Sequence, residues 1–192
     1  KFDDDPTDGV VDSALPAHTA ACNPTCPTLV AGKKGNAYQF TTDRIDVANT
    51  DLNPGQHFTV AAWIRVDSST TENTVAVCEQ SGANCTYGLM VAVNNKPAWY
   101  SDGPAQSTST TTMALGVWYH TMMIWDGTNR ITYVNGTMYD SQPASLTSAS
   151  TKMTIGSRDF ASSPLYFPGS IDEVVFYDRV LTASEIALLS AP

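Results

Sequence analysis

Basic residues are scarce in this chain of 192 residues. Ten Lys and Arg stand against nineteen Asp and Glu, which gives a net charge of −9 at pH 7, and the only adjacent basic pair is Lys33-Lys34. Nucleic-acid binding depends on clustered cations that release phosphate counterions, and an anionic membrane surface also attracts such clusters. The composition therefore argues against nucleic acid and membrane insertion, and it is compatible with a glycan partner and with bound calcium.

Glutamate is also rare, with only Glu72, Glu79, Glu173 and Glu185. Glycoside hydrolysis uses two carboxylates that flank the sugar at separations of about 5 to 9.5 Å. No Glu-x-Asp-x-Glu pattern occurs, and nothing in the sequence places Glu79 beside Asp102, the one pairing left open. We therefore expect no hydrolase.

Histidine occurs only at His18, His57 and His120. The first two lie in loops rich in Pro or Gly, where solvated surface explains them. His120 has no nucleophile nearby and shares a strand face with Trp118, so we predict a buried, hydrogen-bonded structural histidine rather than a base. Since Ser/His/Asp patterns and phosphate-binding glycine loops are also missing, the sequence predicts a protein that is not an enzyme.

The four cysteines are Cys22, Cys26, Cys78 and Cys85. Three pairings are possible, and the short spacings favour Cys22–Cys26 and Cys78–Cys85. Zinc is the competing interpretation, but three and six intervening residues do not form CxxC knuckles. Disulfides predict an extracellular or periplasmic location. Because the sequence begins at Lys1 without Met, signal peptide or membrane span, we expect a processed protein or a module of a larger secreted one.

The stretch from Trp118 to Gly136 holds the strongest β signal. Val117–Trp125 and Arg130–Asn135 are rich in Val, Ile, Thr, Tyr and Trp, and residues 126–129 between them are turn formers. This pattern predicts a hairpin, with a third strand starting near Met138. Both faces of the first run carry large side chains, so we expect it in mid-sheet, with the core on one side and a cover or ligand on the other.

Short β-rich runs separated by turns fill most of the remaining sequence. The clearest is Phe58–Val66, whose alternate residues are all apolar, and Thr182 with Glu185 forms a capping box before the only helix expected, Ala183–Leu189. We expect residues 1–36 to be irregular apart from brief strands at Phe2 and at Val10-Val11. The other predicted strands are Ala37–Phe40, Arg44–Val47, Thr74–Glu79, Tyr87–Val93, Pro97–Tyr100, Lys152–Gly156 and Gly169–Asp178, with Gln106–Thr112 as edge strand or loop and Ser157–Pro168 as loop.

These elements predict an all-β fold over residues 1–192: a single two-sheet antiparallel β-sandwich of jelly-roll type with one short C-terminal helix. Several short stretches of the sequence also resemble those of a known family. They are Phe2-Asp3, Gly35–Phe40, Phe58–Ile64, Trp118–His120, Asp126–Thr128, Tyr133–Gly136, Ile155–Ser157 and Gly169–Val174, followed by Tyr177 and Leu181. In this order the chain resembles the laminin G-like, concanavalin A-like sandwich domains of secreted bacterial proteins, a fold that hosts glycan binding, protein adhesion and spacer roles.

The resemblance also implies a structural calcium ion between the first and last strands. Matching positions point to Asp3 and Asp172 as ligands, with backbone carbonyls near Gly35-Asn36 completing the shell, and we include Asn36 in the metal site. Calcium takes six to eight oxygen ligands, so an ion there would tie the ends of the sandwich together. The alternative is a solvated acidic N-terminus, with Asp172 capping an edge.

Aromatic residues indicate where a glycan would bind, because flat rings stack on the apolar faces of sugars while carboxylates, amides and Arg bond hydroxyls. Trp99 and Tyr100 precede the polar residues Ser101-Asp102-Gly103, where a binding residue would protrude. Tyr87, Arg158 and Tyr166 lie in polar loops or at strand ends. Ordinary packing is the alternative for each. The predicted ligand-binding set is Trp99, Tyr100, Asp102, Arg158, Tyr87 and Tyr166, on the concave sheet face or its rim loops.

The sequence thus predicts a non-catalytic, lectin-like carbohydrate-binding module of a secreted protein, stabilised by calcium. The alternatives are an adhesion or spacer domain that binds a protein partner and, less favoured, a glycan-degrading enzyme with dispersed carboxylates.

Overall fold

Two antiparallel β-sheets stacked face to face make up the protein. The computed structural model describes residues 20–48, 57–70, 74–81, 84–101, 107–146, 152–158 and 165–192. The expected strands at Phe2 and at Val10-Val11 lie outside these ranges. In the described part of the chain, no helix is long and apolar enough to cross a membrane.

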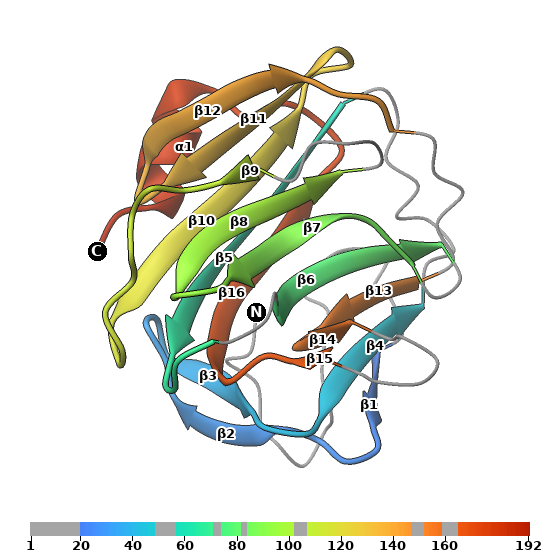
Figure 1. The fold of residues 1–192 in the computed structure, drawn as a ribbon, viewed down its shortest axis with the longest axis vertical. Helices are drawn as coiled ribbons and strands as arrows, with labels where there is room; N and C mark the ends of the chain where they lie inside the picture. Colours follow the sequence, from blue (N-terminus) through green and yellow to red (C-terminus); the bar gives the residue numbers. More distant parts are fainter. Residues whose placement is uncertain are drawn as a thin grey trace.

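One sheet, here called the β7 sheet, has the order β1-β4-β13-β6-β7-β8-β9 and lies in front in Figure 1. Strands β6 to β9 form its larger part. Its strands are β1 (Ala20–Asn23), β4 (Arg44–Ala48), β13 (Lys152–Ile155), β6 (Thr74–Ser81), β7 (Asn84–Ala92), β8 (Lys96–Ser101) and β9 (Ser107–Thr108).

The second sheet, the β5 sheet, has the order β12-β11-β10-β5-β16-β3-β2. A separate two-stranded ribbon pairs β14 (Ser157–Arg158) with β15 (Leu165–Tyr166). The strands of the β5 sheet are β12 (Thr137–Pro143), β11 (Asn129–Val134), β10 (Trp118–Trp125), β5 (Phe58–Val66), β16 (Gly169–Tyr177), β3 (Asn36–Phe40) and β2 (Thr28–Ala31).

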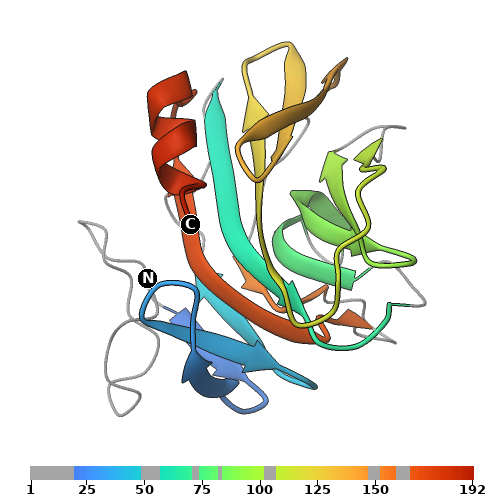
Figure 2. The same cartoon turned by 90° about the vertical axis from the view of Figure 1, so that its left-hand side faces the viewer.

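Strand β10 lies in mid-sheet between β5 and β11, as its two large faces predict. Met123 and Trp125 point into the core between the sheets, whereas Met122 and Ile124 point outward, where helix α1 (Ala183–Leu189) packs. The expected cover is therefore this helix. Figure 2 shows α1 on the side of the β5 sheet that faces away from the β7 sheet.

The core follows the alternation of the strands. In β5, Phe58, Val60 and Ile64 face the interior, while Ala61 belongs to the smaller cluster under α1 with Ile186. Inward residues of the β7 sheet, including Leu89 and Trp99, complete the interior. Since period-2 alternation puts every second side chain on one face, the all-apolar face of Phe58–Val66 predicts this position.

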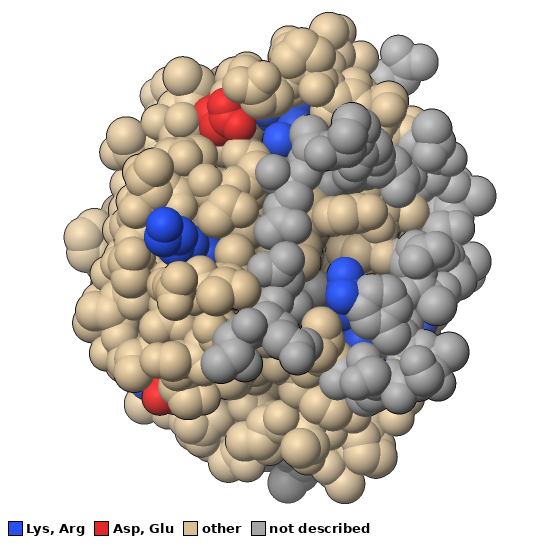
Figure 3. Space-filling view, viewed as in Figure 1, with Lys and Arg blue, Asp and Glu red and all other residues tan. Residues whose placement is uncertain are grey.

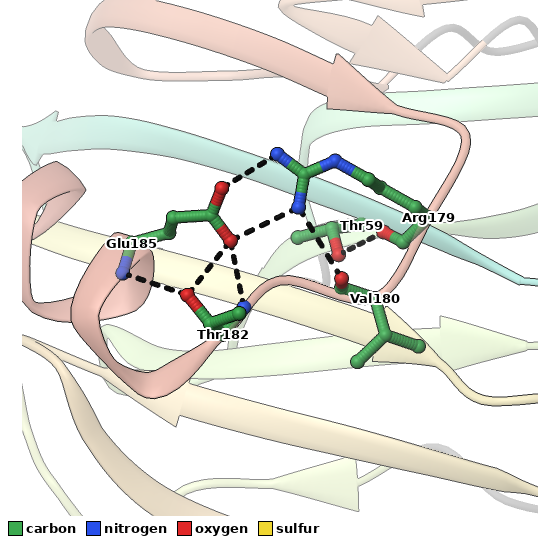
Figure 4. A network of polar contacts seen from close by, with 5 residues as sticks. All are labelled: Thr59, Arg179, Val180, Thr182 and Glu185. Carbon is green, nitrogen blue, oxygen red and sulfur yellow. Dashed lines mark hydrogen bonds and ion pairs between the residues drawn. The ribbon is translucent and has the colours of Figure 1, made fainter.

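The helix begins where the capping box predicts. Thr182 Oγ1 accepts a hydrogen bond from the Glu185 amide, and a Glu185 carboxylate oxygen accepts one of 2.8 Å from the Thr182 amide. Arg179 adds a bidentate ion pair to the same carboxylate, and the Arg179 carbonyl accepts a bond from the Thr59 hydroxyl (Figure 4). The helix is thus joined to β5 at its start.

Both favoured disulfides are formed, Cys22–Cys26 and Cys78–Cys85. Two expectations need correction. Residues 20–31, expected to be irregular, form β1 and β2 because they pair with β4 and β3. The expected loop Ser157–Pro168 contains the ribbon β14–β15. The Ser/Thr run, predicted as edge strand or loop, forms the edge strand β9 at Ser107–Thr108.

Candidate functional site: the open face of the β7 sheet

The outer face of the β7 sheet is not covered by a helix of the described chain. Its centre is the Cys78–Cys85 disulfide with Met90, Ala92 and Ala98, and Tyr100 packs against this group. These five central residues are 0 to 6% exposed, and Tyr100 is half-buried. We call this surface the open face only because no described helix lies on it. Figure 3 views it from outside and shows that its described part is mostly uncharged.

Strand pairing determines which side of β8 each aromatic residue occupies. Tyr100 lies opposite Gly88, so its ring has room on the open face, where it is half-buried. Trp99 lies opposite Leu89 and shares its inward direction. The expectation that Trp99 protrudes is therefore wrong: its side chain is 0% exposed.

Tyr87 is likewise an interior residue rather than one at an exposed strand end. It is 1% exposed, and its ring centroid lies 4.3 Å from that of Phe58. Burial, followed by the charge of Glu79, raises the pKa of the Tyr87 hydroxyl far above its usual range. Glu79 lies opposite Tyr87 and is 1% exposed, so its side chain points into the sandwich, away from the open face.

Arg158 and Tyr100 are the two predicted ligand-binding residues that lie within electrostatic reach of each other. Arg158 is half-buried on β14. Partial burial lowers the pKa of its guanidinium, and the nearby Tyr100 hydroxyl opposes that shift, which places the two groups within electrostatic reach. A phenol group and a guanidinium with several N–H donors are thus within electrostatic reach of each other near this face.

Of the remaining predicted residues, some are described by the structure and others are not. Tyr166 is half-buried on β15 opposite Ser157, so it lies on the other face of the ribbon from Arg158. Asp102 and Asp3 lie outside the described residues.

Asp172 is buried on β16, on the outer side of the β5 sheet, and both of its carboxylate oxygens accept backbone hydrogen bonds. Oδ2 accepts one of 2.9 Å from the Lys34 amide, and Oδ1 one of 2.6 Å from the Glu173 amide. Burial raises the pKa of Asp172, which the amides of Lys34 and Glu173 partly offset. The geometry is that of a carboxylate holding a loop against a strand.

Two oxygens near Gly32 are suited to a cation. A Cβ at Gly32 would lie 2.6 Å from Asp172 Oδ2 and 2.9 Å from the Asn36 carbonyl oxygen, so these oxygens are within 5.5 Å of each other. Hard cations such as calcium prefer carboxylate and carbonyl oxygens, so this pair fits part of a calcium shell. No group of three or more His, Cys, Asp or Glu suited to a metal occurs among the described residues.

His120 is buried at 2% exposure, as predicted, but Nδ1 has no hydrogen-bond partner among the described residues. Its ring packs edge-on against Trp63, with centroids 5.3 Å apart. Burial, followed by the charge of Lys34, lowers the pKa of His120 to about 4. It is thus a neutral packing residue at physiological pH, and the expected hydrogen bond is not seen at Nδ1.

Comparison with known proteins supplies the family. Residues 39–187 match Laminin_G_3, described as the concanavalin A-like lectin/glucanases superfamily. The chain belongs to this family. No curated protein matches closely enough to count as a relative.

Several solved structures have a similar fold. Domain 4 of AbnA, a GH43 extracellular arabinanase from Geobacillus stearothermophilus in complex with arabinotriose, is 18% identical with a TM-score of 0.70, covering 91% of this chain and 88% of that domain. The botulinum neurotoxin DC binding domain in complex with SialylT is 10% identical with a TM-score of 0.70, over 96% of this chain and 48% of the other. A Trypanosoma rangeli sialidase is 16% identical with a TM-score of 0.69, over 84% and 28%.

These identities establish a shared fold and nothing finer. The chain spans less than half of the neurotoxin and sialidase chains, whereas it matches nearly the whole of AbnA domain 4. The family and its neighbours include both binding domains and enzymes.

Proposed function

We propose that this Laminin_G_3 domain is a non-catalytic carbohydrate-binding module. The observation that carries the proposal is the half-buried ring of Tyr100 on the sheet face that no described helix covers, with the half-buried Arg158 of β14 within electrostatic reach. Aromatic rings stack on the C–H faces of sugars, and a guanidinium donates several hydrogen bonds to hydroxyls in a fixed geometry. Tyr100 packs against the buried apolar cluster of this face.

Several of the similar structures hold sugars or sugar analogues, and one of these is the Trypanosoma rangeli sialidase with 2,3-difluoro-KDN. AbnA domain 4 is in complex with arabinotriose and the neurotoxin DC binding domain with SialylT. AbnA domain 4 carries more weight here because the match covers 88% of that domain. A binding role for the whole folded unit is therefore compatible with this architecture.

The non-catalytic part of the proposal rests on where the described carboxylates lie. Glu79 points into the core, and Asp172 with Glu173 lies on the other sheet. On the open face, Asp46 is engaged by Arg44 and Lys152 at 2.9 and 3.7 Å. Hydrolysis needs a free pair of carboxylates facing the sugar, and the described residues of the open face offer none.

Binding to an array of neutral and acidic oligosaccharides, followed by titration calorimetry on the best ligand, tests the proposal. We expect Tyr100→Ala to weaken binding at least tenfold, since it removes the stacking surface. The matched control is Tyr177→Ala, a half-buried tyrosine on the opposite side of the sandwich, which should leave the affinity unchanged. No glycan signal, or equal effects of the two substitutions, would overturn the proposal.

A protein partner is the alternative function, favoured by a botulinum neurotoxin DC binding domain solved with rat synaptotagmin II, 11% identical with a TM-score of 0.68. In that case the glycan array is silent and a protein ligand is retained instead. Turnover of an oligosaccharide that is abolished by Glu79→Gln would favour an enzyme, although such activity would require Glu79 to leave the core.

Calcium and secretion complete the proposal. The Asp172 carboxylate and the Asn36 carbonyl supply two adjacent oxygens, and Asp3 is our proposed third ligand. A chelator should lower the melting temperature, and added calcium, but not magnesium, should restore it; an unchanged melting curve removes the ion from the proposal. Two disulfides support a role outside the cytoplasm.

A further inference from the structure

One edge of the sandwich is closed by side chains rather than by a strand ladder. Strand β9 ends the β7 sheet and β12 ends the β5 sheet. Ser107 Oγ donates a 2.7 Å hydrogen bond to Asp140 Oδ2, and the Tyr139 hydroxyl donates one of 3.0 Å to the Thr108 carbonyl. We call these four residues with Gln142 the β9–β12 edge.

Tyr139 is aimed across this edge by a β-bulge. In the β11–β12 pairing Thr132 lies opposite Asp140 and Tyr133 opposite Met138, so Tyr139 is the extra residue. Bulges commonly redirect a side chain in this way. The ring stacks on Trp99 with centroids 5.7 Å apart and planes 21° apart, and its hydroxyl is fixed at Thr108.

Tyr139 as a whole residue is nevertheless 36% exposed, whereas Trp99 behind it is fully buried. The ring is therefore held at its hydroxyl and on one side while part of it faces solvent. Such a ring loses little conformational entropy when a ligand stacks on it, since it is already ordered.

Polar groups surround the Tyr139 ring. Asp140 Oδ1 accepts a 3.0 Å hydrogen bond from Gln142 Nε2, and Gln142 is exposed. Although burial works to raise the pKa of Asp140, hydrogen bonds from Gln142, Ser107 and the Ser141 amide, with the charge of Arg130, lower it overall. Arg130 is 2% exposed and lies opposite Gln142, so a buried cation is near this carboxylate.

We propose that the β9–β12 edge is a second carbohydrate-contact site, which takes one neutral sugar unit. The ring offers a stacking surface, Asp140 keeps lone pairs that accept from sugar hydroxyls, and Gln142 keeps one N–H and its carbonyl. Arg130, opposite Gln142 on β11, puts a cation within electrostatic reach of the Asp140 carboxylate, and one charge of each sign favours a neutral sugar over an ionic ligand.

Closing the sandwich edge accounts for only part of this arrangement. The Ser107–Asp140 bond and the tyrosine hydroxyl bond suffice to join the two sheets. A solvent-facing aromatic surface beside an exposed Gln142 amide is not needed for closure, but it is what stacking and hydroxyl recognition require.

The proposal extends the binding function to a surface distinct from the open face, because Tyr100 and Trp99 are neighbours on β8 that point to opposite sides. Titration of ¹⁵N-labelled protein with four neutral trisaccharides (arabinotriose, xylotriose, cellotriose and mannotriose) tests it. At least one should shift the side-chain amide resonances of Gln142 together with the backbone amides of Tyr139 and Asp140.

Variants then assign the shifts. Tyr139→Ala and Gln142→Ala should each weaken binding at this edge at least fivefold. Met138→Ala, whose side chain is 58% exposed on the neighbouring position, is the matched control and should change nothing. Tyr139→Ala also removes the contact with Trp99, so a melting curve is recorded for each variant. If Tyr139→Ala lowers the melting temperature, the binding affinity of Gln142→Ala tests the site instead, because Gln142 is exposed.

Two outcomes overturn the proposal and can be told apart. Shifts confined to residues around Tyr100 would leave the proposed function standing and remove the second site. An absence of shifts anywhere with all four trisaccharides, together with a silent glycan array, would remove both.

Discussion

The carboxylate of Asp172 holds the backbone amide of Lys34 at 2.9 Å although the two residues are 138 positions apart in the chain. The same side chain accepts a bond from the Glu173 amide, where β16 has a bulge and Glu173 has a positive φ of 47°. One buried carboxylate therefore fixes both the turn between β2 and β3 and an irregular point of a central strand.

Asp172→Asn tests this dual attachment. The substitution replaces one acceptor oxygen by an N–H₂ group that faces a backbone donor, and it removes the charge that strengthens both bonds. We expect the free energy of unfolding, measured by urea denaturation, to fall by about 1 to 3 kcal/mol.

The control for this substitution is Asp178→Asn, since Asp178 is exposed near the end of the same region. It should change stability by less than about 0.5 kcal/mol. Equal stability of the Asp172 variant and the parent would mean that the two hydrogen bonds contribute no net stability.

How far sequence predicts this structure depends on whether a feature is local. Phe58–Val66 and Ala183–Leu189 match β5 and α1 at both ends, because alternation and a capping box are written within a few residues. Strands β1 and β2 escaped prediction because each is only four residues long and is ordered by its partner strand.

The binding residues show the same limit. Parity places Trp99 and Tyr100 on opposite faces, but only the pairing with Leu89 and Gly88 decides which of them is inside. The sequence does not predict the position of Tyr139 at this edge, because a bulge is defined by the pairing with the partner strand. Asp140 and Gln142 gained a candidate role only once β9 and β12 were seen together.

Two aliphatic side chains of equal size on α1, one buried and one exposed, test how the helix packs on the β5 sheet. Ile186 is 6% exposed in the cluster with Met122 and Ile124, whereas Leu188 is 72% exposed. Ile186→Ala should lower the free energy of unfolding by about 2 to 4 kcal/mol, because it removes buried methyl groups and leaves a cavity. Leu188→Ala should leave it within about 0.5 kcal/mol in the same thermal or urea measurement.

Similar losses from the two helix substitutions would contradict the described docking of α1. A large loss from Leu188→Ala alone would mean that the opposite helix face is the buried one.

The two disulfides should differ in their resistance to reductant. Cys78 and Cys85 are 0% and 4% exposed under the open face, whereas Cys26 is exposed. Thiolate attack requires access to a sulfur atom, so dithiothreitol should reduce Cys22–Cys26 first in the native protein. Alkylation followed by peptide mass spectrometry measures the order.

Removing the buried disulfide should also destabilise the protein. For a loop closed over a sequence separation of 7, chain entropy gives about 2.5 kcal/mol, so the double substitution Cys78→Ala with Cys85→Ala should show a loss of that size. Reduction of Cys78–Cys85 before Cys22–Cys26, or an unchanged stability of the double variant, would contradict its place beneath Tyr100.

His120 should make the protein sensitive to acid. Burial and the charge of Lys34 lower its pKa to about 4 in the folded state, against about 6.5 in the unfolded chain. Between these values the unfolded state binds the extra proton, so stability is complete above pH 6.5 and falls as the pH drops toward 4. A difference of about 2.5 pKa units corresponds to a loss of about 3 kcal/mol.

Replacing His120 with Phe isolates this contribution, because Phe keeps an aromatic ring against Trp63 and cannot be protonated. Asp172 acts in the opposite direction, since its raised pKa makes its protonation on acidification favour the folded state. The parent should therefore lose stability between pH 6.5 and 4 more steeply than His120→Phe, while the exposed His57→Phe should follow the parent. If urea midpoints of the parent and His120→Phe keep a constant difference across this range, His120 is not the group that acid unfolding protonates.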